Sequence, residues 1–171
     1  MKRVINVTRY LMKQKIFCFG DDFVIRDESG NDRFYVDGKV FCLGNQLSFQ
    51  NMQGHELAYI KQHLLALGPT YSIYRDGNLV AVVRKHLFTF FHCAFTVDVP
   101  GPDDLVAQGN LFDHEYTFSR SGSVVATVSK RWFSWTDTYG VEVSPGEDDI
   151  LILASTVVID MACHPDEPAK S

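Results

Sequence analysis

Apolar and polar positions alternate in short segments over roughly the first 140 residues, and glycine-containing turns separate the segments. Residues 23–27 run into the turn 28–31, after which the alternation resumes. Residues 47–51 likewise meet the turn 53–55 and continue as residues 57–61. Alternation with a period of two is typical of strands with one buried face, and a glycine at the turn is typical of hairpins. The pattern therefore predicts a series of antiparallel hairpins.

An internal repeat is the most informative feature of the chain, because residues 71–85 resemble residues 116–130 at an offset of 45. Each copy contains a turn, Asp-Gly-Asn or Ser-Gly-Ser, whose glycine supplies the positive φ that tight hairpins require. The fold therefore reuses one hairpin design. Seven positions are identical in the two copies: Tyr71/Tyr116, Arg75/Arg120, Gly77/Gly122, Val80/Val125, Ala81/Ala126, Val83/Val128 and Lys85/Lys130. Alternation along the returning strands predicts a core face made of Leu79, Ala81, Val83, Val124, Ala126 and Val128.

The final segment differs in kind from the hairpins. Residues 150–163 are almost wholly apolar and follow the acidic residues 147–149, which suit a helix N-terminus. His164-Pro165 then ends the helix. A buried β-branched strand is the alternative for this run, but its length and its capped ends favour a helix at about 149–163. A helix that is apolar on every side must be surrounded, and the preceding strands supply an antiparallel sandwich or closed barrel to surround it.

The composition is typical of a single globular domain. At 171 residues, with 46% hydrophobic and 22% charged residues, the chain matches one globular domain, which we place at 1–164 with a flexible tail at 165–171. The net charge of −5 argues against a protein whose whole surface attracts nucleic acid or anionic lipid, which leaves only a local basic patch, and no nucleic-acid partner is expected. The apolar run is far shorter than the roughly 20 residues that span a bilayer, so no transmembrane segment is expected.

Cysteine usage and the N-terminus suggest a cytoplasmic protein. The four cysteines, Cys18, Cys42, Cys93 and Cys163, are scattered and form no C-x-x-C pair, which predicts buried thiols in a reducing compartment. The first ten residues contain recurring charges and no apolar stretch of signal-peptide length.

Motifs along the whole chain resemble the LURP-one-related family. They are Lys13-Gln14-Lys15 with Phe17, residues 22–27, the hairpin 71–85, Ser129-Lys130-Arg131-Trp132-Phe133, residues 137–141 and the closing helix with Asp160. The resemblance extends from about residue 5 to residue 163. It implies a tubby-like fold, a mainly β, closed antiparallel barrel of about twelve strands around a central hydrophobic C-terminal helix. Tubby-like relatives bind phosphoinositides, and plant members of the family are linked to defence responses, but the fold carries no shared chemistry.

Basic pairs at two strand ends are the candidate ligand-binding residues. If the tubby analogy extends to function, Arg84, Lys85, Lys130 and Arg131 are the candidates for binding an anionic headgroup, because phosphate is held by charge-assisted hydrogen bonds. The simpler interpretation is that these residues are charges that keep the barrel rims soluble.

Asp160 is unusual, because a carboxylate near the C-terminus of an apolar helix opposes the helix dipole. If it is buried it needs a partner, and we expect a structural pair with an Arg or Lys at the barrel mouth. Asp113-His114-Glu115 contains metal-ligand residue types, but neighbours on a strand point to opposite faces, so we interpret the trio as solvated hairpin polarity. No metal site, cofactor or catalytic set is predicted.

Two hypotheses for function follow. The first is a non-enzymatic barrel that binds phosphoinositide or another acidic ligand at a membrane surface, for which a contiguous basic patch would be diagnostic. The second is a cytosolic structural or protein-interaction domain with no lipid binding, which an exposed apolar patch would favour.

Overall fold

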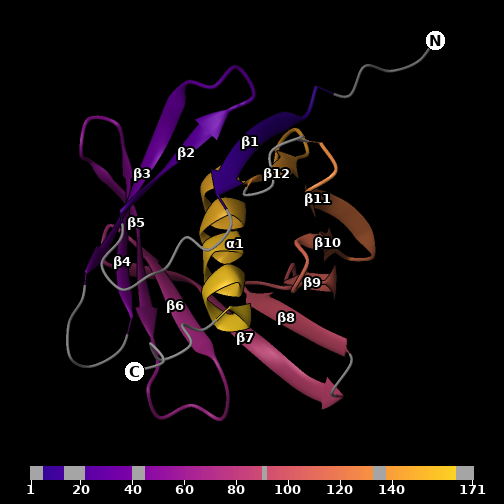
Figure 1. Ribbon diagram of the computed structural model, residues 1–171. Coiled ribbons are helices and arrows are strands. Elements are labelled where there is room, and N and C mark those ends of the chain that lie inside the picture. Colours follow the sequence, from indigo (N-terminus) through magenta and orange to yellow (C-terminus); the bar gives the residue numbers. More distant parts are fainter. Residues whose placement is uncertain (1–5, 14–21, 40–44, 90–91, 133–137, 165–171) are drawn as a thin grey trace, which may run out of the picture.

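The computed structural model describes residues 6–13, 22–39, 45–89, 92–132 and 138–164. Over these residues the chain forms twelve β-strands and one α-helix, and the strands close into a barrel with the helix at its centre (Figure 1). The predicted fold class is confirmed, whereas the tail 165–171 lies outside the described residues. The strands are β1 (Thr8–Lys13), β2 (Phe23–Asp27), β3 (Asp32–Lys39), β4 (Gln46–Asn51), β5 (Glu56–Gln62), β6 (Thr70–Arg75), β7 (Asn78–Thr89), β8 (His92–Asp98), β9 (Leu105–Asn110), β10 (Glu115–Arg120), β11 (Ser123–Ser129) and β12 (Thr138–Val143), and the helix is α1 (Asp149–Cys163).

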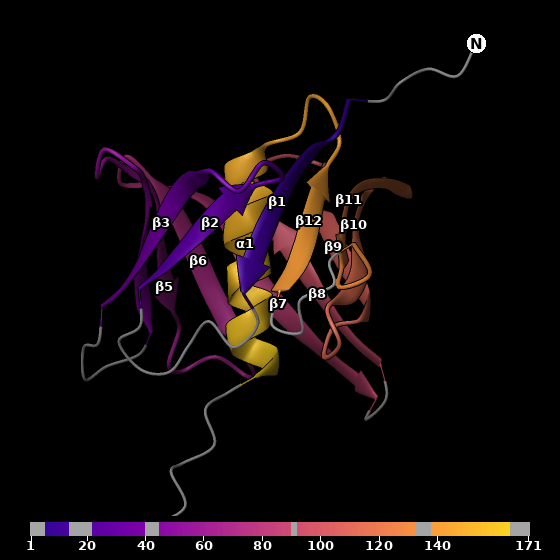
Figure 2. The same ribbon diagram turned by 45° about the horizontal axis from the view of Figure 1, so that its top comes forward.

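Barrel topology is the simplest possible, since each strand pairs antiparallel with its neighbours in the chain. The first and last strands complete the circle, with Thr8 opposite Val143 and Lys13 opposite Thr138 (Figure 2). Because the strands alternate in direction, loops that follow odd-numbered strands lie at the end where α1 ends. We call this the lower end, as in Figure 1, and the opposite end the upper end.

Four hairpins at the upper end share one construction. Their turns carry glycines with positive φ, namely Gly30, Gly54, Gly77 and Gly122. In each hairpin the strand register shifts directly before the turn, which is the effect of a β-bulge. The reuse of one design therefore extends beyond the two copies visible in the sequence.

Because of the bulges, two residues of the predicted core face are exposed. Ala81, Val83, Ala126 and Val128 are buried as expected, but Leu79 is 49% exposed and Val124 is 55% exposed. Both exposed residues lie next to the turn, beyond the position where the register shifts. A shift of one residue turns a side chain to the other face, so strict alternation gives the wrong face there.

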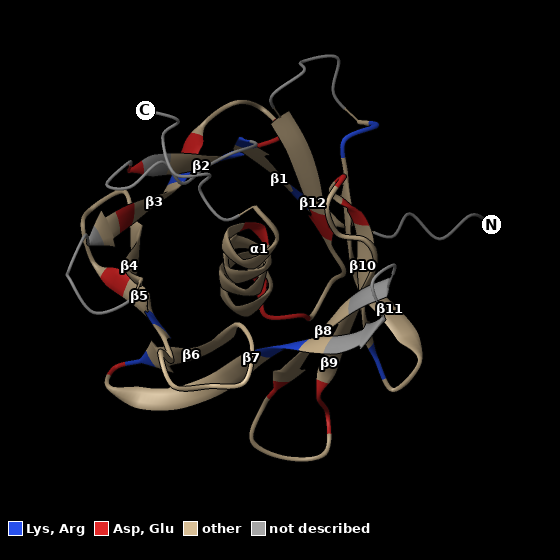
Figure 3. Ribbon diagram, turned by 60° about the horizontal axis from the view of Figure 1, so that its bottom comes forward, with Lys and Arg blue, Asp and Glu red and all other residues tan. Residues whose placement is uncertain are grey.

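Helix α1 is buried along nearly its whole length. Asp148 caps it by accepting a hydrogen bond from the Leu151 N–H, and residues from Leu151 to Met161 are each at most 7% exposed. The view along the barrel shows strands around the helix on all sides (Figure 3). At 1.5 Å per residue its 15 residues span about 22 Å, enough to reach from one barrel end to the other. Within the described residues, no helix has the length and apolar character needed to cross a bilayer.

The repeated arginines hold the start of the helix. Arg75 makes two hydrogen bonds of 2.6 Å to the Asp148 carboxylate, and Arg120 makes one of 2.6 Å to Glu147. Each arginine ends the first strand of its repeat copy, so the two copies present equivalent side chains to one acidic segment. Cys163 is buried at the other end of the helix, while Cys18 and Cys42 and the side chain of Cys93 lie outside the described residues.

Candidate functional site

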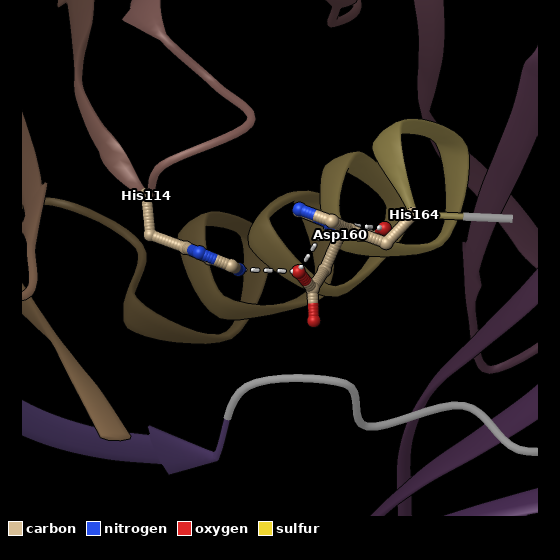
Figure 4. Close-up of side chains that lie close together, drawn as sticks. All are labelled: His114, Asp160 and His164. Carbon is tan, nitrogen blue, oxygen red and sulfur yellow. Dashed lines mark hydrogen bonds and ion pairs between the residues drawn. The ribbon is translucent and has the colours of Figure 1, made fainter. Parts of the chain in front are cut away.

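A buried carboxylate with two imidazoles lies at the lower end of the barrel. Asp160, in the last turn of α1, is 3% exposed. Its Oδ1 atom lies 2.5 Å from His114 Nε2 and 3.1 Å from His164 Nδ1 (Figure 4). We call these three residues the His-Asp-His cluster. Asp160 therefore has two histidines as partners, where the sequence led us to expect an arginine or lysine.

The loop between β9 and β10 carries His114 into the barrel. Leu111 is buried at the start of the loop, and the His114 N–H donates to the Leu111 carbonyl at 3.4 Å. His114 itself has a φ of 55°, a left-handed conformation that turns its side chain inward, where it is 3% exposed. Gly109 lies just before the loop with a φ of 138°, and a Cβ there would lie 2.8 Å from the Glu115 carbonyl oxygen. Close packing of β9 on β10 thus requires glycine at this position.

His164 caps the C-terminus of the helix. Its backbone N–H donates to the Asp160 carbonyl, and its Nε2 lies 2.9 Å from the Phe112 carbonyl oxygen. The two imidazole rings lie parallel, with an interplanar angle of 2° and centroids 4.9 Å apart. The His164 side chain is 27% exposed, so the cluster reaches the surface on this side.

Electrostatics favours a negatively charged Asp160 beside positively charged histidines in the cluster. Burial raises the pKa of Asp160, but the hydrogen bonds and positive charge of His114 and His164 outweigh burial and leave that pKa below its usual value. The hydrogen bond to Asp160 raises the pKa of His164, against the opposing effect of partial burial. Asp160 is consequently held as a carboxylate, which explains how a charge is tolerated in an apolar core.

Two tyrosines extend this polar region within the core. Tyr139 stacks on His114 with centroids 4.2 Å apart. Burial raises the pKa of Tyr116 and of Tyr139 well above the ordinary value, and the negative charge of Asp160 adds to the effect. Both phenols therefore stay neutral beside the carboxylate.

Exposed leucines project from the loop between β5 and β6 at the same lower end. Leu64 is 55% exposed, and Leu65 and Leu67 are as exposed as in an extended chain, at 101% and 102%. The base of the loop is fixed, because the His63 N–H donates to the Thr70 carbonyl at 2.8 Å and the Lys85 N–H donates to the Pro69 carbonyl at 3.1 Å. We call residues 63–69 the leucine loop.

The four predicted headgroup residues occupy different settings. Arg84 lies on the outside of β7 in an ion pair with Asp98, whereas Lys85 lies on the same face as Ala81 and Val83 and its Nζ is 5.7 Å from the centre of the Phe112 ring. Lys130 follows β11, and its backbone N–H donates to Glu115. Arg131 is 84% exposed and lies 3.7 Å from Glu115. Three strands separate β7 from β11, so the four residues do not converge on one pocket.

Charge is unevenly distributed between the two barrel ends. The loops at the upper end, all of them described, contain six acidic residues and no Lys or Arg: Glu28, Asp76, Asp103, Asp104, Glu147 and Asp148. The described loop residues of the lower end contain two basic residues, Lys130 and Arg131, and two acidic residues, Asp22 and Asp113, while Lys13, Lys61 and Lys85 lie on strands near this end. The acidic excess of the described loops is therefore confined to the upper end.

The segment Asp113-His114-Glu115 divides into three separate roles. Asp113 is exposed and accepts from Asn110, and Glu115 accepts from the Ser129 hydroxyl and from the Lys130 N–H. Only His114 enters the His-Asp-His cluster, so its interpretation as solvated hairpin polarity was wrong. The reason is that the residue lies in a loop with positive φ, where strand alternation does not apply.

Comparisons with known proteins agree with the fold. Residues 8–160 match the sequence pattern of the LURP-one-related family. A protein of Bacillus subtilis (strain 168) with the name "Uncharacterized protein YxjI" is 34% identical over 156 residues, covering 91% of this chain and 94% of that protein. An X-ray structure of a protein from Arabidopsis thaliana matches with a TM-score of 0.64 at 20% identity, covering 90% of this chain and 88% of that one. At that identity the plant structure shows a shared fold alone.

Proposed function

The chain belongs to the LURP-one-related family, and from this premise we propose that it is a binding domain that docks on anionic phospholipid membranes through its lower end. The single observation that carries the proposal is the leucine loop, whose apolar side chains lie in water with Lys61 and Lys85 beside them. An exposed apolar patch by itself suits a protein partner equally well, and the adjacent lysines are what favour an anionic membrane. The resemblance to tubby-like proteins agrees with this proposal, because tubby-like relatives bind phosphoinositides.

The leucine loop supplies the apolar contribution. Burial of a leucine side chain that was in water is worth about 1.5–3 kcal/mol, so insertion of Leu65 and Leu67 into the acyl boundary is favourable by a few kcal/mol. Phe112 lies at the same end, is 51% exposed, and adds an aromatic ring suited to the interface. A cluster of exposed apolar side chains of this kind marks a contact surface.

Lysines around the loop supply the electrostatic contribution. Lys61 lies near the end of β5, one residue before that strand meets the loop, and Lys85 is hydrogen-bonded to the loop through its backbone. Each lysine near an anionic leaflet contributes about 1 kcal/mol. The acidic upper end is repelled by the same surface, which orients the barrel with its leucines toward the lipid.

Arg84 has no part in this proposal. Its guanidinium is already paired with Asp98 on the outer wall, so the headgroup ligands beside the leucine loop are Lys61 and Lys85, while Lys130 and Arg131 lie at the same end but are separated from β7 by three strands. This revises the set expected from the sequence, in which Arg84 and Lys85 were treated as a unit.

The test is sedimentation of the purified protein with vesicles of phosphatidylcholine alone or with phosphatidylserine or phosphoinositide, at low and physiological salt. We expect binding that requires the anionic lipid, weakens with salt, and falls at least tenfold in the Leu65→Asp/Leu67→Asp variant. Leu79→Asp is the matched control, because Leu79 is an exposed leucine in a turn of the upper end. Equal binding by the wild type and the leucine-loop variant would refute the proposal. Absence of binding to every vesicle would leave a protein partner as the function of this surface.

A further inference from the structure

The geometry points to a divalent metal site at the His-Asp-His cluster, for a transition-metal ion of the zinc class. One ligand atom each from His114, Asp160 and His164 lies within 4.8 Å of the other two. Two imidazoles and one carboxylate are the ligand types that Zn²⁺, Co²⁺ and Fe²⁺ accept, with a remaining position for water. This inference is independent of membrane docking, since the side chains involved are different and the two share only Phe112, through its ring there and its backbone carbonyl here.

Hydrogen bonding at His164 shows why a cation belongs in the cluster. A carbonyl oxygen only accepts hydrogen bonds, so the contact of 2.9 Å to the Phe112 carbonyl requires Nε2 of His164 to carry a hydrogen. The other ring nitrogen, Nδ1, then faces the Asp160 carboxylate at 3.1 Å and the Asp160 carbonyl at 3.2 Å. A bare lone pair directed at these two acceptors is repelled. A cation must therefore lie between them, either a proton on Nδ1 or a metal ion in its place.

The surroundings of His164 match those of a metal ligand. Histidines that bind metals usually donate their second ring N–H to a backbone carbonyl or carboxylate, which fixes the ring and its tautomer. The bond from His164 to Phe112 does this in advance. His164 is the C-cap residue, directly after α1 and four residues after Asp160, so both ligands lie on the same side of the helix end.

Unused polar atoms supply further coordinating capacity. Among the described residues, Asp160 Oδ2, His114 Nδ1 and the Tyr139 hydroxyl are buried without a hydrogen-bond partner. Buried polar atoms are rarely left unsatisfied, so each of these calls for an explanation. The unpaired second carboxylate oxygen, Oδ2, gives Asp160 a further ligand atom for the ion beside Oδ1, which faces His164.

The orientation of the two imidazole rings indicates which of the three ligands bind the ion most directly. The imidazole planes are parallel, and a nitrogen ligand binds an ion in the plane of its own ring, so one ion meets both histidines only after a ring turns. His164 is partly exposed and follows Asp160 by four residues at the end of the helix, so these two residues form the core of the site. His114, 3% exposed and stacked on Tyr139, joins it by rotation of its ring.

The experiment is titration of the metal-free protein with Zn²⁺ by calorimetry in two buffers of different ionisation enthalpy, followed by Co²⁺ absorption spectroscopy. We expect one ion per chain, release of a proton on binding, and affinity that rises with pH, because the ion displaces the proton from Nδ1. His164→Gln should lower the affinity at least a hundredfold, and His114→Gln about tenfold. His63→Gln, a histidine of the leucine loop, is the matched control and should leave the affinity unchanged.

Several outcomes would overturn the assignment. They are the absence of stoichiometric binding, binding that survives His164→Gln, and a cobalt spectrum with the intense sulfur-to-metal band of a cysteine site. His164 is half-buried at the end of the helix, so its substitution tests the site in a folded protein. A circular dichroism melt of each variant verifies that the barrel is intact.

Discussion

The two ends of α1 are held by different kinds of charged contact, partly exposed at one end and buried at the other. At the upper end, Asp148 and Glu147 meet Arg75 and Arg120 in pairs whose side chains are between 15% and 40% exposed. At the lower end, Asp160 meets His114 in a pair whose side chains are 4% and 2% exposed. The upper carboxylates also agree with the helix dipole, whereas Asp160 opposes it.

The difference shows at which end of α1 the loss of one side chain destabilises the fold more. Partly exposed ion pairs contribute little because water competes with them, and here the two pairs act together with the 2.5 Å hydrogen bond from the Tyr10 hydroxyl to Asp149. A buried pair contributes little net energy when complete, yet loss of one partner leaves a desolvated charge. The upper end is therefore redundant, and the lower end depends on every member of its cluster.

Substitution of His114 by leucine should give the largest effect. It removes one of the two partners of a buried carboxylate, and we expect a loss of about 3 kcal/mol in the free energy of unfolding, measured by urea denaturation. Replacement of both residues, His114→Leu with Asp160→Leu, should recover at least half of that loss, since no buried charge remains. A single variant as stable as the wild type would show that the cluster does not support the helix.

Asp148→Ala should have a smaller effect at the upper end. The change removes both the N-cap hydrogen bond to Leu151 and the pair with Arg75, which together are worth about 1–2 kcal/mol. Asp148→Asn keeps the cap and removes only the charge, so its loss should be about half as large. If Asp148→Ala cost more than His114→Leu in the same assay, the proposed order of the two ends would be reversed.

Acid should weaken the upper anchor by a still smaller amount. Burial raises the pKa of Asp148, but hydrogen bonds from Arg75 and from the start of the helix outweigh burial and lower it. A carboxyl group with a depressed pKa in the folded state stabilises above its unfolded pKa, about 3.9, and loses that contribution as pH falls through the folded value. The stability difference between wild type and Asp148→Asn should thus be constant from pH 5 to 7 and shrink below about pH 4, measured by urea denaturation across this range. A difference that grew on acidification would contradict this assignment.

Much of the fold could be predicted from local patterns. Turn glycines and alternating strands predicted hairpins, and an apolar run with acidic residues before it predicted the central helix, because these signals depend on neighbours in the chain. The repeat marked Arg75 and Arg120 as equivalent positions. It did not show that both bind the acidic segment before α1, since that contact joins residues 27 and 73 positions apart.

The candidate sites were harder to predict, for identifiable reasons. The sequence drew attention to Asp160 and to its need for a partner, but a histidine 46 residues earlier is brought to it only by the closed barrel. A left-handed backbone at His114 leaves no signature in a non-glycine residue. The leucine loop resembles a short apolar turn in the sequence, and exposure of its side chains is a property of the folded surface.

The sequence by itself determined the elements of this protein, their order and the need to bury one apolar helix, because backbone preference and hydrophobic period act over a few residues. The tertiary structure alone decided which side chains meet at each end of that helix. Barrel closure puts Arg75, Arg120 and the acidic segment at one end and His114, Asp160 and His164 at the other, and strand register, shifted by bulges, selects which of them face inward.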